Sequence, residues 1–474
     1  MDADGDFMTE RNSGKLRQSS YNIIVPLSSH VLKSDKPLYI LANPLYGNTS
    51  LIDEKEYEIL QKFPEIDEGT VVSDLRSEGY ITNLTDGKER KLMEERYEAQ
   101  KKPKDPRASF VITYQCNLRC TYCWSGYLFS RDEKCTTVID EKTVDAGVDV
   151  IPQIPALQSV KYMSLYGGEP FLASTLSIVR YILEKGSERG YAFHANTNGT
   201  HLKLFAPLLA QHDIAAIGVT LDGCADVHNA RRKRLNGSGT FHRIVGGIDT
   251  ALDEGIPVGV RINVDAENLP HLPAFGDWIK EHGWAYRRDV TFAISLVRPG
   301  IGSEWGAFLT YPEMAKRIIS LMRESPFLLG IMPYEWEYIT EGYLSHAILH
   351  GAELQPRPFY CSAHCQGYAF DLFGDIYSCP RAVGDRRFSI GRFVPTLQFN
   401  ENYEQWFHRD VLSIPTCRSC DLALLCGGGC AYEGYLLHDT IYEGYCERYR
   451  AFIEYGMPLF VRRRMWTESK EDAQ

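Results

Sequence analysis

The sequence predicts an α/β fold whose centre is an open, partial barrel of six β–α units. Strand-like and helix-like runs alternate regularly between residues 109 and 324. Six such units are too few to close a barrel of the usual eight. The chain has 474 residues, of which 44% are hydrophobic. At roughly 150 residues per domain, this length predicts smaller units on either side of the barrel.

The strand-like runs are apolar and short, and an amphipathic run follows each. Successive β–α units require parallel strands joined by helical crossovers. We expect strands at 110–114, 160–165, 192–197, 216–221, 258–264 and 290–295. We expect helices at 142–150, 174–185, 202–210, 241–253, 269–280 and 312–322.

A smaller unit precedes the barrel and a cysteine-rich unit follows it. Short apolar strands at 21–25 and 38–41 precede amphipathic runs at 53–63 and 69–78. A charged helix or linker over 84–106 then ends at two prolines. We therefore divide the chain into a polar, disordered terminus, an N-terminal domain with its linker, the barrel, a cysteine-rich domain and a C-terminal tail: 1–18, 19–106, 107–330, 331–455 and 456–474.

Composition excludes several classes of protein. The chain has 51 basic and 62 acidic side chains, for a net charge of −11. A general binder of nucleic acid or of anionic membranes needs a cationic face. No apolar run approaches the roughly 18–20 residues that cross a bilayer, and the acidic N-terminus does not resemble a signal peptide. We expect a cytoplasmic protein with no nucleic-acid or membrane partner.

The 13 cysteines are clustered. In a reducing compartment, clustered cysteines more often bind metal or do chemistry than form disulfides. Three lie within eight residues and eight lie between 361 and 446, whereas Cys135 and Cys224 stand alone. We expect these two to pack as ordinary cysteines.

The first cluster lies at the carboxyl end of the first barrel strand, where such folds assemble active sites. Three thiolates on one loop can hold three corners of a cubane iron–sulfur cluster and leave one iron open to a small molecule. Zinc would have an incomplete tetrahedral site here. The three ligands are Cys116, Cys120 and Cys123.

This loop resembles that of the radical S-adenosylmethionine (SAM) enzymes, which carry C-x3-C-x2-C with an aromatic residue, here Tyr122, before the last cysteine. The second strand ends in Gly167-Gly168-Glu169-Pro170, similar to the family's GGEP segment. The resemblance implies that this segment receives the methionine ammonium group of SAM, for which close backbone approach and a carboxylate are suited. Taken alone, the segment is equally typical of a turn.

Two further segments resemble the branch of this family that carries extra clusters. Asn198 and Thr220 end the third and fourth strands. The Thr220 hydroxyl, where the family has serine, keeps a contact to the ribose of SAM. Asn229 replaces an aspartate, which puts the role of that position in doubt. Arg232 is expected to pair with the methionine carboxylate or to lie in a basic surface turn.

The C-terminal cysteines resemble the SPASM extension of radical enzymes that modify peptides and proteins. The resemblance implies two auxiliary 4Fe-4S clusters, and with the first cluster three in all. The inner cluster would be held by Cys361, Cys365, Cys379 and Cys430, and the outer one by Cys417, Cys420, Cys426 and Cys446. A pair of structural zinc ribbons is the alternative, because C-x2-C is also a zinc spacing.

The N-terminal unit resembles the small winged-helix modules that take the leader of a precursor peptide as an added edge strand. The segment 38–54 carries this resemblance. The alternative is a packing domain that shields the barrel.

The resemblance implies a peptide maturase. A one-electron donor of flavodoxin or ferredoxin type would reduce the cluster, and SAM would yield a 5′-deoxyadenosyl radical that takes hydrogen from a ribosomally made precursor peptide. The product would be a crosslink, a thioether or a backbone change. No general base can be assigned, and the aromatic residues of 334–343 fit either a peptide channel or a core.

Two other functions stay open. An anaerobic sulfatase-maturating enzyme, which forms formylglycine, would carry an aspartate directly after the cysteine of the G-x4-C element, where Cys379 is followed by Pro380 and Arg381. A non-catalytic iron–sulfur carrier or zinc scaffold would not cleave SAM.

Overall fold

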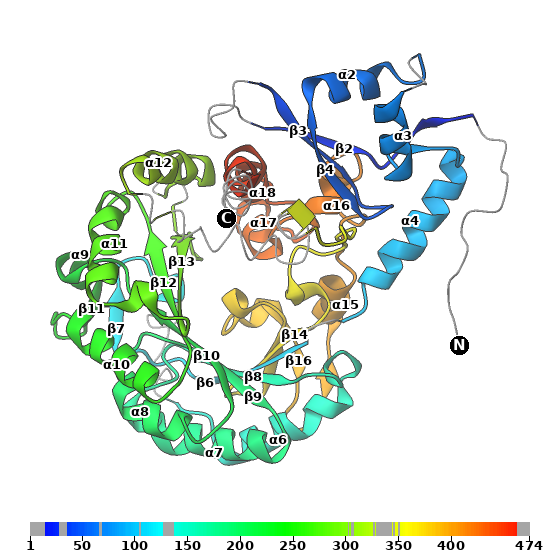
Figure 1. Cartoon of the computed structure of the whole chain (residues 1–474). Coiled ribbons are helices and arrows are strands. Elements are labelled where there is room, and N and C mark those ends of the chain that lie inside the picture. The colour runs from blue at the N-terminus through cyan, green and yellow to red at the C-terminus, as the bar shows by residue number, and fades with distance from the viewer. Residues whose placement is uncertain are drawn as a thin grey trace, which may run out of the picture.

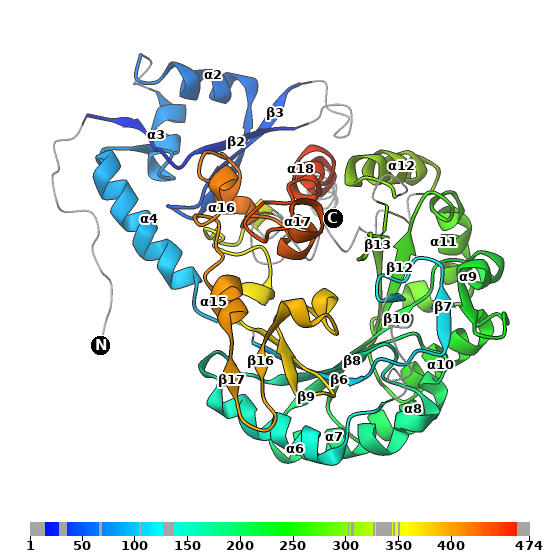
Figure 2. The same cartoon turned by 180° about the vertical axis from the view of Figure 1, so that it is seen from behind.

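The computed structural model describes residues 15–27, 36–65, 69–103, 106–126, 137–301, 303–304, 308–325, 328, 344, 347–348 and 351–461. The chain forms three parts (Figure 1). The C-terminal part, drawn in yellow to red, lies between the blue N-terminal part and the cyan and green central sheet in both views (Figures 1 and 2). The predicted positions of Cys135 and of residues 334–343 lie outside the described residues.

The N-terminal unit is a small α+β unit with its own core. Its three-stranded antiparallel sheet has the order β2-β3-β4, and β1 pairs with β5 in a second antiparallel sheet. Helix α2 begins where predicted, because Asp53 and Glu56 cap each other's backbone N–H groups. The elements are β1 Arg17–Gln18, β2 Ile23–Pro26, β3 Leu38–Asn43, β4 Asn48–Asp53, α2 Glu54–Lys62, α3 Thr70–Ser77, β5 Ile81–Thr82 and α4 Asp86–Gln100.

Strand β1 falls in the stretch that the sequence assigns to a disordered terminus. Arg17 explains its order, since the guanidinium donates to the carboxylate of the buried Glu89 at 2.7 Å. The 84–106 linker is helical over α4 and begins with Thr85 as its N-cap.

The central sheet contains the six predicted strands, all parallel to their neighbours in the order β13-β12-β10-β9-β8-β6. Beyond β6 the same sheet continues into the C-terminal part, so the six strands do not close on themselves. Every boundary lies within three residues of the predicted one. The strands are β6 Arg107–Thr113, β8 Tyr162–Gly167, β9 Ala192–Thr197, β10 Ile214–Thr220, β12 Val258–Val264 and β13 Val290–Leu296.

Helices follow the strands and cover the outer face of the sheet (Figures 1 and 2). They are α6 Glu141–Val150, α7 Leu176–Glu188, α8 Leu202–Leu209, α9 Ala225–Arg231, α10 Phe241–Asp253, α11 Leu272–Glu281 and α12 Tyr311–Glu324. Helix α9 was not predicted, whereas the others match the predicted runs within three residues. In the described part of the chain, no helix has the length and apolar character needed to cross a membrane.

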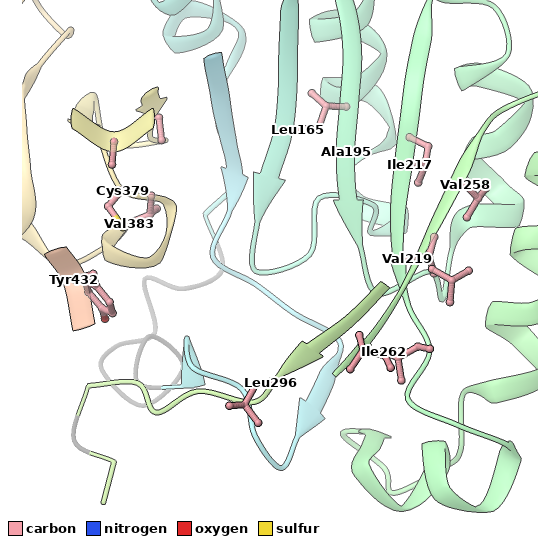
Figure 3. Close-up of a cluster of buried hydrophobic side chains, with 14 of the residues drawn as sticks. Leu165, Ala195, Ile217, Val219, Val258, Ile262, Leu296, Cys379, Val383 and Tyr432 are labelled. Atoms are coloured by element: carbon pink, nitrogen blue, oxygen red, sulfur yellow. The ribbon is translucent and has the colours of Figure 1, made fainter. Parts of the chain in front are cut away.

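Each central strand alternates between two kinds of side chain because successive residues point to opposite faces. One face is buried against the helices: Gly186 on α7 lies so close to Phe193 and Met163 that an added Cβ would approach them to 2.6 and 3.0 Å. Figure 3 shows Leu165, Ala195, Ile217, Val219 and Ile262 among these buried side chains. The opposite face is half-exposed and largely polar, with Tyr162, Ser164, Tyr166, His194, Thr220, Arg261, Asn263 and Ser295.

The C-terminal part joins the sheet through β14, which is parallel to β6, and continues with the antiparallel strands β15, β16 and β17. The chain stays helical and buried through Met457, Phe460 and Val461, within the predicted tail. The elements are β14 Gly367–Phe370, β15 Asp375–Tyr377, β16 Ser389–Arg392, β17 Gln398–Phe399, α15 Glu401–Phe407, α16 Ala423–Cys426, α17 Ala431–His438, α18 Glu447–Ala451 and a π-helix over Phe452–Gly456.

Candidate functional site

The first cysteine loop is fixed by a two-stranded sheet that sequence reasoning missed. Strand β7, Leu118–Cys120, pairs antiparallel with β11, Arg232–Arg234, so that Arg232 lies opposite Cys120. Strands of three residues carry too little periodicity to be recognised in a sequence. The pairing brings the predicted Arg232 to the predicted cysteines.

The three thiols of this loop lie together at the carboxyl ends of β6 and β9. Burial, together with the negative charge of the nearby Glu169, Cys120 and Cys123, raises the pKa of Cys116 to about 12. The Cys116 sulfur accepts weak hydrogen bonds from Leu118 N at 3.5 Å and from Asn198 Nδ2 at 3.7 Å. The predicted Asn198 therefore lies beside the first thiol.

The carboxylate of Glu169 is almost fully engaged by protein donors. Its Oε1 accepts from Phe171 N at 2.8 Å and from the Thr197 hydroxyl at 2.5 Å, and its Oε2 accepts from Asn198 N at 2.6 Å. Only 1% of Glu169 is exposed, and burial raises its pKa. In this structure Glu169 ties the end of β8 to the end of β9, a role that the motif alone does not reveal.

The two glycines before Glu169 pack against backbone rather than around an open space. A Cβ at Gly167, whose φ is +143°, would lie 2.3 Å from the Thr113 carbonyl oxygen. At Gly168 it would lie 2.4 Å from the Tyr114 carbonyl oxygen. Only glycine allows the second strand to approach the start of the cysteine loop this closely.

Tyr122 is the centre of a buried polar network. Its hydroxyl donates to Asp222 Oδ2 and accepts from Arg232 Nη1 at 2.8 Å and from Asn263 Nδ2 at 3.2 Å. The Arg231 guanidinium stacks over the ring at 4.7 Å. Asp222 is fully buried, and its charge helps to hold both arginines.

Arg232 has capacity for a further acceptor. It is 5% exposed, and its Nε has no hydrogen-bond partner among the described residues. The charges of Cys120, Tyr122 and Asp222 raise its pKa against the effect of burial. A buried donor without a partner marks a place where an anionic ligand group fits.

Asn229 stabilises the fold. Its Oδ1 accepts from Thr240 N at 2.7 Å and from Phe241 N at 3.0 Å, which caps the start of α10. Thr220 lies at the end of β10 on the half-exposed face, in register with Arg261.

Four of the C-terminal thiols form an inner group. Burial, followed by the charges of Cys430 and Cys361, raises the pKa of Cys379. Burial and Cys361 raise the pKa of Cys365 to about 12. These electrostatic contacts agree with the predicted inner set, whose role as cluster ligands stays a prediction.

The other four thiols form an outer group. Burial, then Cys446 and Cys420, raises the pKa of Cys417 to about 11, and burial with Cys446 among its causes raises that of Cys426 to about 12. A Cβ at Gly444 would lie 3.6 Å from the Cys446 sulfur and 3.7 Å from the Cys417 sulfur.

The donor chemistry of the three groups fits iron–sulfur clusters, because each is made of thiols alone and each lies in a protected site. Cys224 was predicted to pack as an ordinary cysteine, and it packs against the edge of the main core. Among the described residues, no three His, Cys, Asp or Glu side chains converge in the arrangement that holds a single metal ion. The assignment of clusters to these groups stays a prediction.

Tyr166 was missed as a site residue, although it precedes the GGEP segment. Its hydroxyl donates to the Pro380 carbonyl oxygen at 3.3 Å. Besides burial, the charges that act on the pKa of Tyr166 are those of Cys379 and Arg381 near the inner group and those of Cys123 and Arg261 in the central domain. Tyr166 thus lies between the first cysteine loop and the inner group.

A second missed feature is a buried ion cluster that joins the sheet to the inner group. Glu433 Oε1 accepts from Arg381 Nη1 at 2.7 Å and from Arg298 Nε at 3.1 Å. Arg381 also donates to the Pro299 carbonyl oxygen at 2.9 Å. Because Arg381 follows Cys379 and Glu433 follows Cys430, these pairs fix both cysteine loops to the end of β13.

The N-terminal unit reaches the outer group through α4. Tyr97, only 2% exposed, packs in one apolar cluster with Val411, Ile414 and Cys417. At the end of this helix, Lys101 Nζ pairs with Asp410 at 2.8 Å.

Comparison with known proteins identifies the central domain. Residues 110–278 match the family model of the radical SAM superfamily. The chain is 26% identical over 335 residues to the mycofactocin maturase MftC of Mycolicibacterium smegmatis, covering 68% of this chain and 77% of the relative. It is 21% identical over 372 residues to a cysteine-type anaerobic sulfatase-maturating enzyme of Clostridium perfringens, covering 73% and 94%.

Two solved structures share the fold. Native anSMEcpe with bound AdoMet superimposes with a TM-score of 0.58 at 21% identity, over 76% of this chain and 99% of that one. SuiB of Streptococcus suis bound to its precursor peptide SuiA gives a TM-score of 0.51 at 14% identity, over 91% and 98%.

Proposed function

We propose that this chain, whose residues 110–278 match the radical SAM family model and which is similar to peptide and sulfatase maturases, is a radical SAM enzyme that acts on a ribosomally made precursor peptide. The observation that carries the proposal is the position of the Cys116 loop at the carboxyl end of β6, where Asn198 Nδ2 lies 3.7 Å from the Cys116 sulfur, together with eight further cysteines between residues 361 and 446. A set of three leaves a cubane with one open iron, whereas a set of four completes it.

We assign SAM and one cluster to the first loop and an auxiliary cluster to each set of four. When SAM is bound and reduced by one electron, it supplies a 5′-deoxyadenosyl radical that takes a hydrogen atom from carbon. Cys116, Cys120 and Cys123 would hold the cluster. The unpartnered Nε of Arg232 supports a contact with the carboxylate of SAM, and the position of Thr220 supports a contact with its ribose.

The peptide would bind on the half-exposed polar face of the six strands, which we take as the inside of a partial barrel. Tyr166 and Arg261 on this face lie between the two cysteine sites. A residue of the peptide held there would be near both SAM and the inner group. The product would be a crosslink, a thioether or a backbone change.

The N-terminal unit would receive the leader of the peptide. The three-stranded antiparallel sheet β2-β3-β4 with helices α2 and α3 after it supports the winged-helix assignment. Five of the six residues of β4, a strand at the edge of its sheet, are half-buried or exposed, and only Ile52 is buried, which supports the addition of a strand at this edge. A flavodoxin or ferredoxin-type donor would supply the electrons.

Sulfatase maturation is the second candidate, because the chain covers 94% of such a relative. The residues after Cys379 disfavour it. Pro380 replaces the aspartate expected there, and the next side chain, Arg381, is engaged with Glu433.

The substrate is tested with anaerobically reconstituted protein, SAM and dithionite. One reaction contains a candidate precursor peptide encoded beside this chain, and the other a sulfatase peptide with its active-site cysteine or serine. We expect mass spectrometry to find a mass change only in the precursor peptide. A change only in the sulfatase peptide would establish the second candidate, and a precursor peptide left unchanged would refute the proposal.

A further inference from the structure

Among the residues that the structure describes, no carboxylate pairs with the buried cation Arg409. It follows α15, is 0% exposed and is the largest of the fully buried side chains. Its Nε donates to the Ile441 carbonyl oxygen, and its Nη2 donates to those of Gly428 at 2.9 Å and Gly429 at 3.3 Å. A guanidinium removed from water is costly unless negative charge surrounds it.

The remaining contact of Arg409 is also uncharged. His364 Nδ1 lies 2.9 Å from the Trp406 carbonyl oxygen, so this nitrogen carries the ring hydrogen. Its Nε2 then accepts from Arg409 Nη1 at 3.4 Å.

All four contacts lie in loops that carry the auxiliary cysteines. His364 lies between Cys361 and Cys365 of the inner group. Gly428 and Gly429 lie between Cys426 of the outer group and Cys430 of the inner group. The guanidinium therefore binds the backbone that connects the two sites.

The connecting backbone is shaped to present its carbonyl groups. Gly427, Gly428 and Gly429 have φ values of 75°, 91° and 69°, all in the left-handed region. A Cβ at Gly427 would lie 2.4 Å from the Phe359 carbonyl oxygen. Three successive residues of this conformation require glycine, and they turn two carbonyl oxygens toward Arg409.

The negative charge near Arg409 comes from both cysteine groups. Burial lowers the pKa of Arg409, and the charges of four thiols oppose this effect. These thiols are Cys430 and Cys361 of the inner group and Cys417 and Cys426 of the outer group. Four thiolates around a 4Fe-4S cluster leave the site with net negative charge. Two such sites would provide the anions that Arg409 otherwise lacks.

We propose that Arg409 is a positioning residue that bridges the two auxiliary clusters and raises the reduction potential of both. The proposal rests on the proposed function, because it requires iron–sulfur clusters at both sets of four cysteines. Reduction adds negative charge to a cluster, and a fixed cation nearby in a medium of low dielectric constant favours that state.

The test uses the full-length protein reconstituted anaerobically with iron and sulfide. Arg409→Gln removes the charge and keeps hydrogen-bonding capacity, whereas Arg409→Lys keeps the charge and loses the planar fork. Arg386→Gln is the matched control, since Arg386 lies in the same part of the chain, is 74% exposed and pairs with Asp375. Metal content is measured first, followed by redox titration monitored by electron paramagnetic resonance.

We expect the potentials of both auxiliary clusters to become more negative in Arg409→Gln, while that of the first cluster stays unchanged. Arg409→Lys should remain near the wild type, as should Arg386→Gln. Potentials unchanged in Arg409→Gln, or changed for one auxiliary cluster only, would overturn the proposal and leave the proposed function intact.

Loss of clusters is also informative. If Arg409→Gln assembles no auxiliary cluster, then retention in Arg409→Lys supports a role of the charge, and loss in both variants overturns it. Zinc in place of iron in the wild type would overturn both this proposal and the proposed function.

Discussion

Replacing Glu433 by glutamine tests how the C-terminal part is fixed to the sheet. Glu433 is 1% exposed and accepts from Arg381 and Arg298, whose side chains are 23% and 10% exposed. Removing one partner of a buried ion pair costs about 3–5 kcal/mol. Because glutamine still accepts one hydrogen bond and Arg381 is partly exposed, we expect the lower value, about 3 kcal/mol.

Hydrogen exchange measures this loss locally, which matters because a chain of several parts does not unfold in one step. A loss of about 3 kcal/mol corresponds to roughly a hundredfold faster exchange of the amides in α17, at 1.4 kcal/mol per factor of ten. The control is Glu404→Gln, in which the lost partner is His408 at an exposed pair. We expect the control to stay within threefold of the wild type.

The stabilisation that Glu433 provides in the wild type depends on pH, whereas glutamine at this position does not titrate. The arginines hold the pKa of Glu433 below its usual value against the effect of burial. The stabilisation is therefore complete above the unfolded pKa of about 4.3 and is lost as the pH falls through the lower folded pKa. Exchange in α17 that is equal in Glu433→Gln and in the wild type at pH 7 would refute this reasoning.

Three further substitutions have defined outcomes. Tyr166→Phe removes the hydrogen bond to the Pro380 carbonyl oxygen, worth about 1 kcal/mol, which joins the proposed peptide site to the inner group. If that contact positions the peptide, we expect a kcat/KM for the peptide that is up to about fivefold lower, with unchanged iron content; an unchanged kcat/KM would contradict that placement. Tyr97→Ala, but not Tyr97→Phe, should speed the loss of iron from the outer site to a chelator, because the ring packs against Cys417; equal rates in both variants would show that α4 does not protect this site. Burial raises the pKa of Asp371 to about 6, so the wild type loses stability as the pH rises from 4 to 7 and Asp371→Asn does not; we expect the stability of the variant relative to the wild type to rise by up to about 3 kcal/mol over this range, and a difference in hydrogen exchange of β14 and β15 that does not change with pH would contradict the shift.

The regular part of the fold was accessible from sequence because alternation of apolar strands and amphipathic helices dictates a parallel sheet. The division of the cysteines into cluster ligands came from the resemblance, and it stays a prediction. The sequence did not reveal that Glu169 joins the end of β8 to the end of β9, because its donors, Thr197 and Asn198, lie almost thirty residues away in the chain. Contacts of this kind depend on tertiary packing, which no local pattern encodes.

Arg409 illustrates the same limit. In the sequence, nothing distinguishes Arg409 from the other arginines of the chain. Only the folded chain shows that its guanidinium donates to carbonyl groups in loops that carry cysteines. Tyr166 is similar: its position next to the GGEP segment was visible, but its place between two cysteine sites required the C-terminal part to be folded onto the sheet.

The most direct test of the central claim is the formation of 5′-deoxyadenosine by the reconstituted protein with SAM and dithionite. The account predicts formation by the wild type and none by a variant in which Cys116, Cys120 and Cys123 are all alanine, with iron still bound at the two sets of four cysteines. Equal amounts of 5′-deoxyadenosine from both proteins would contradict it.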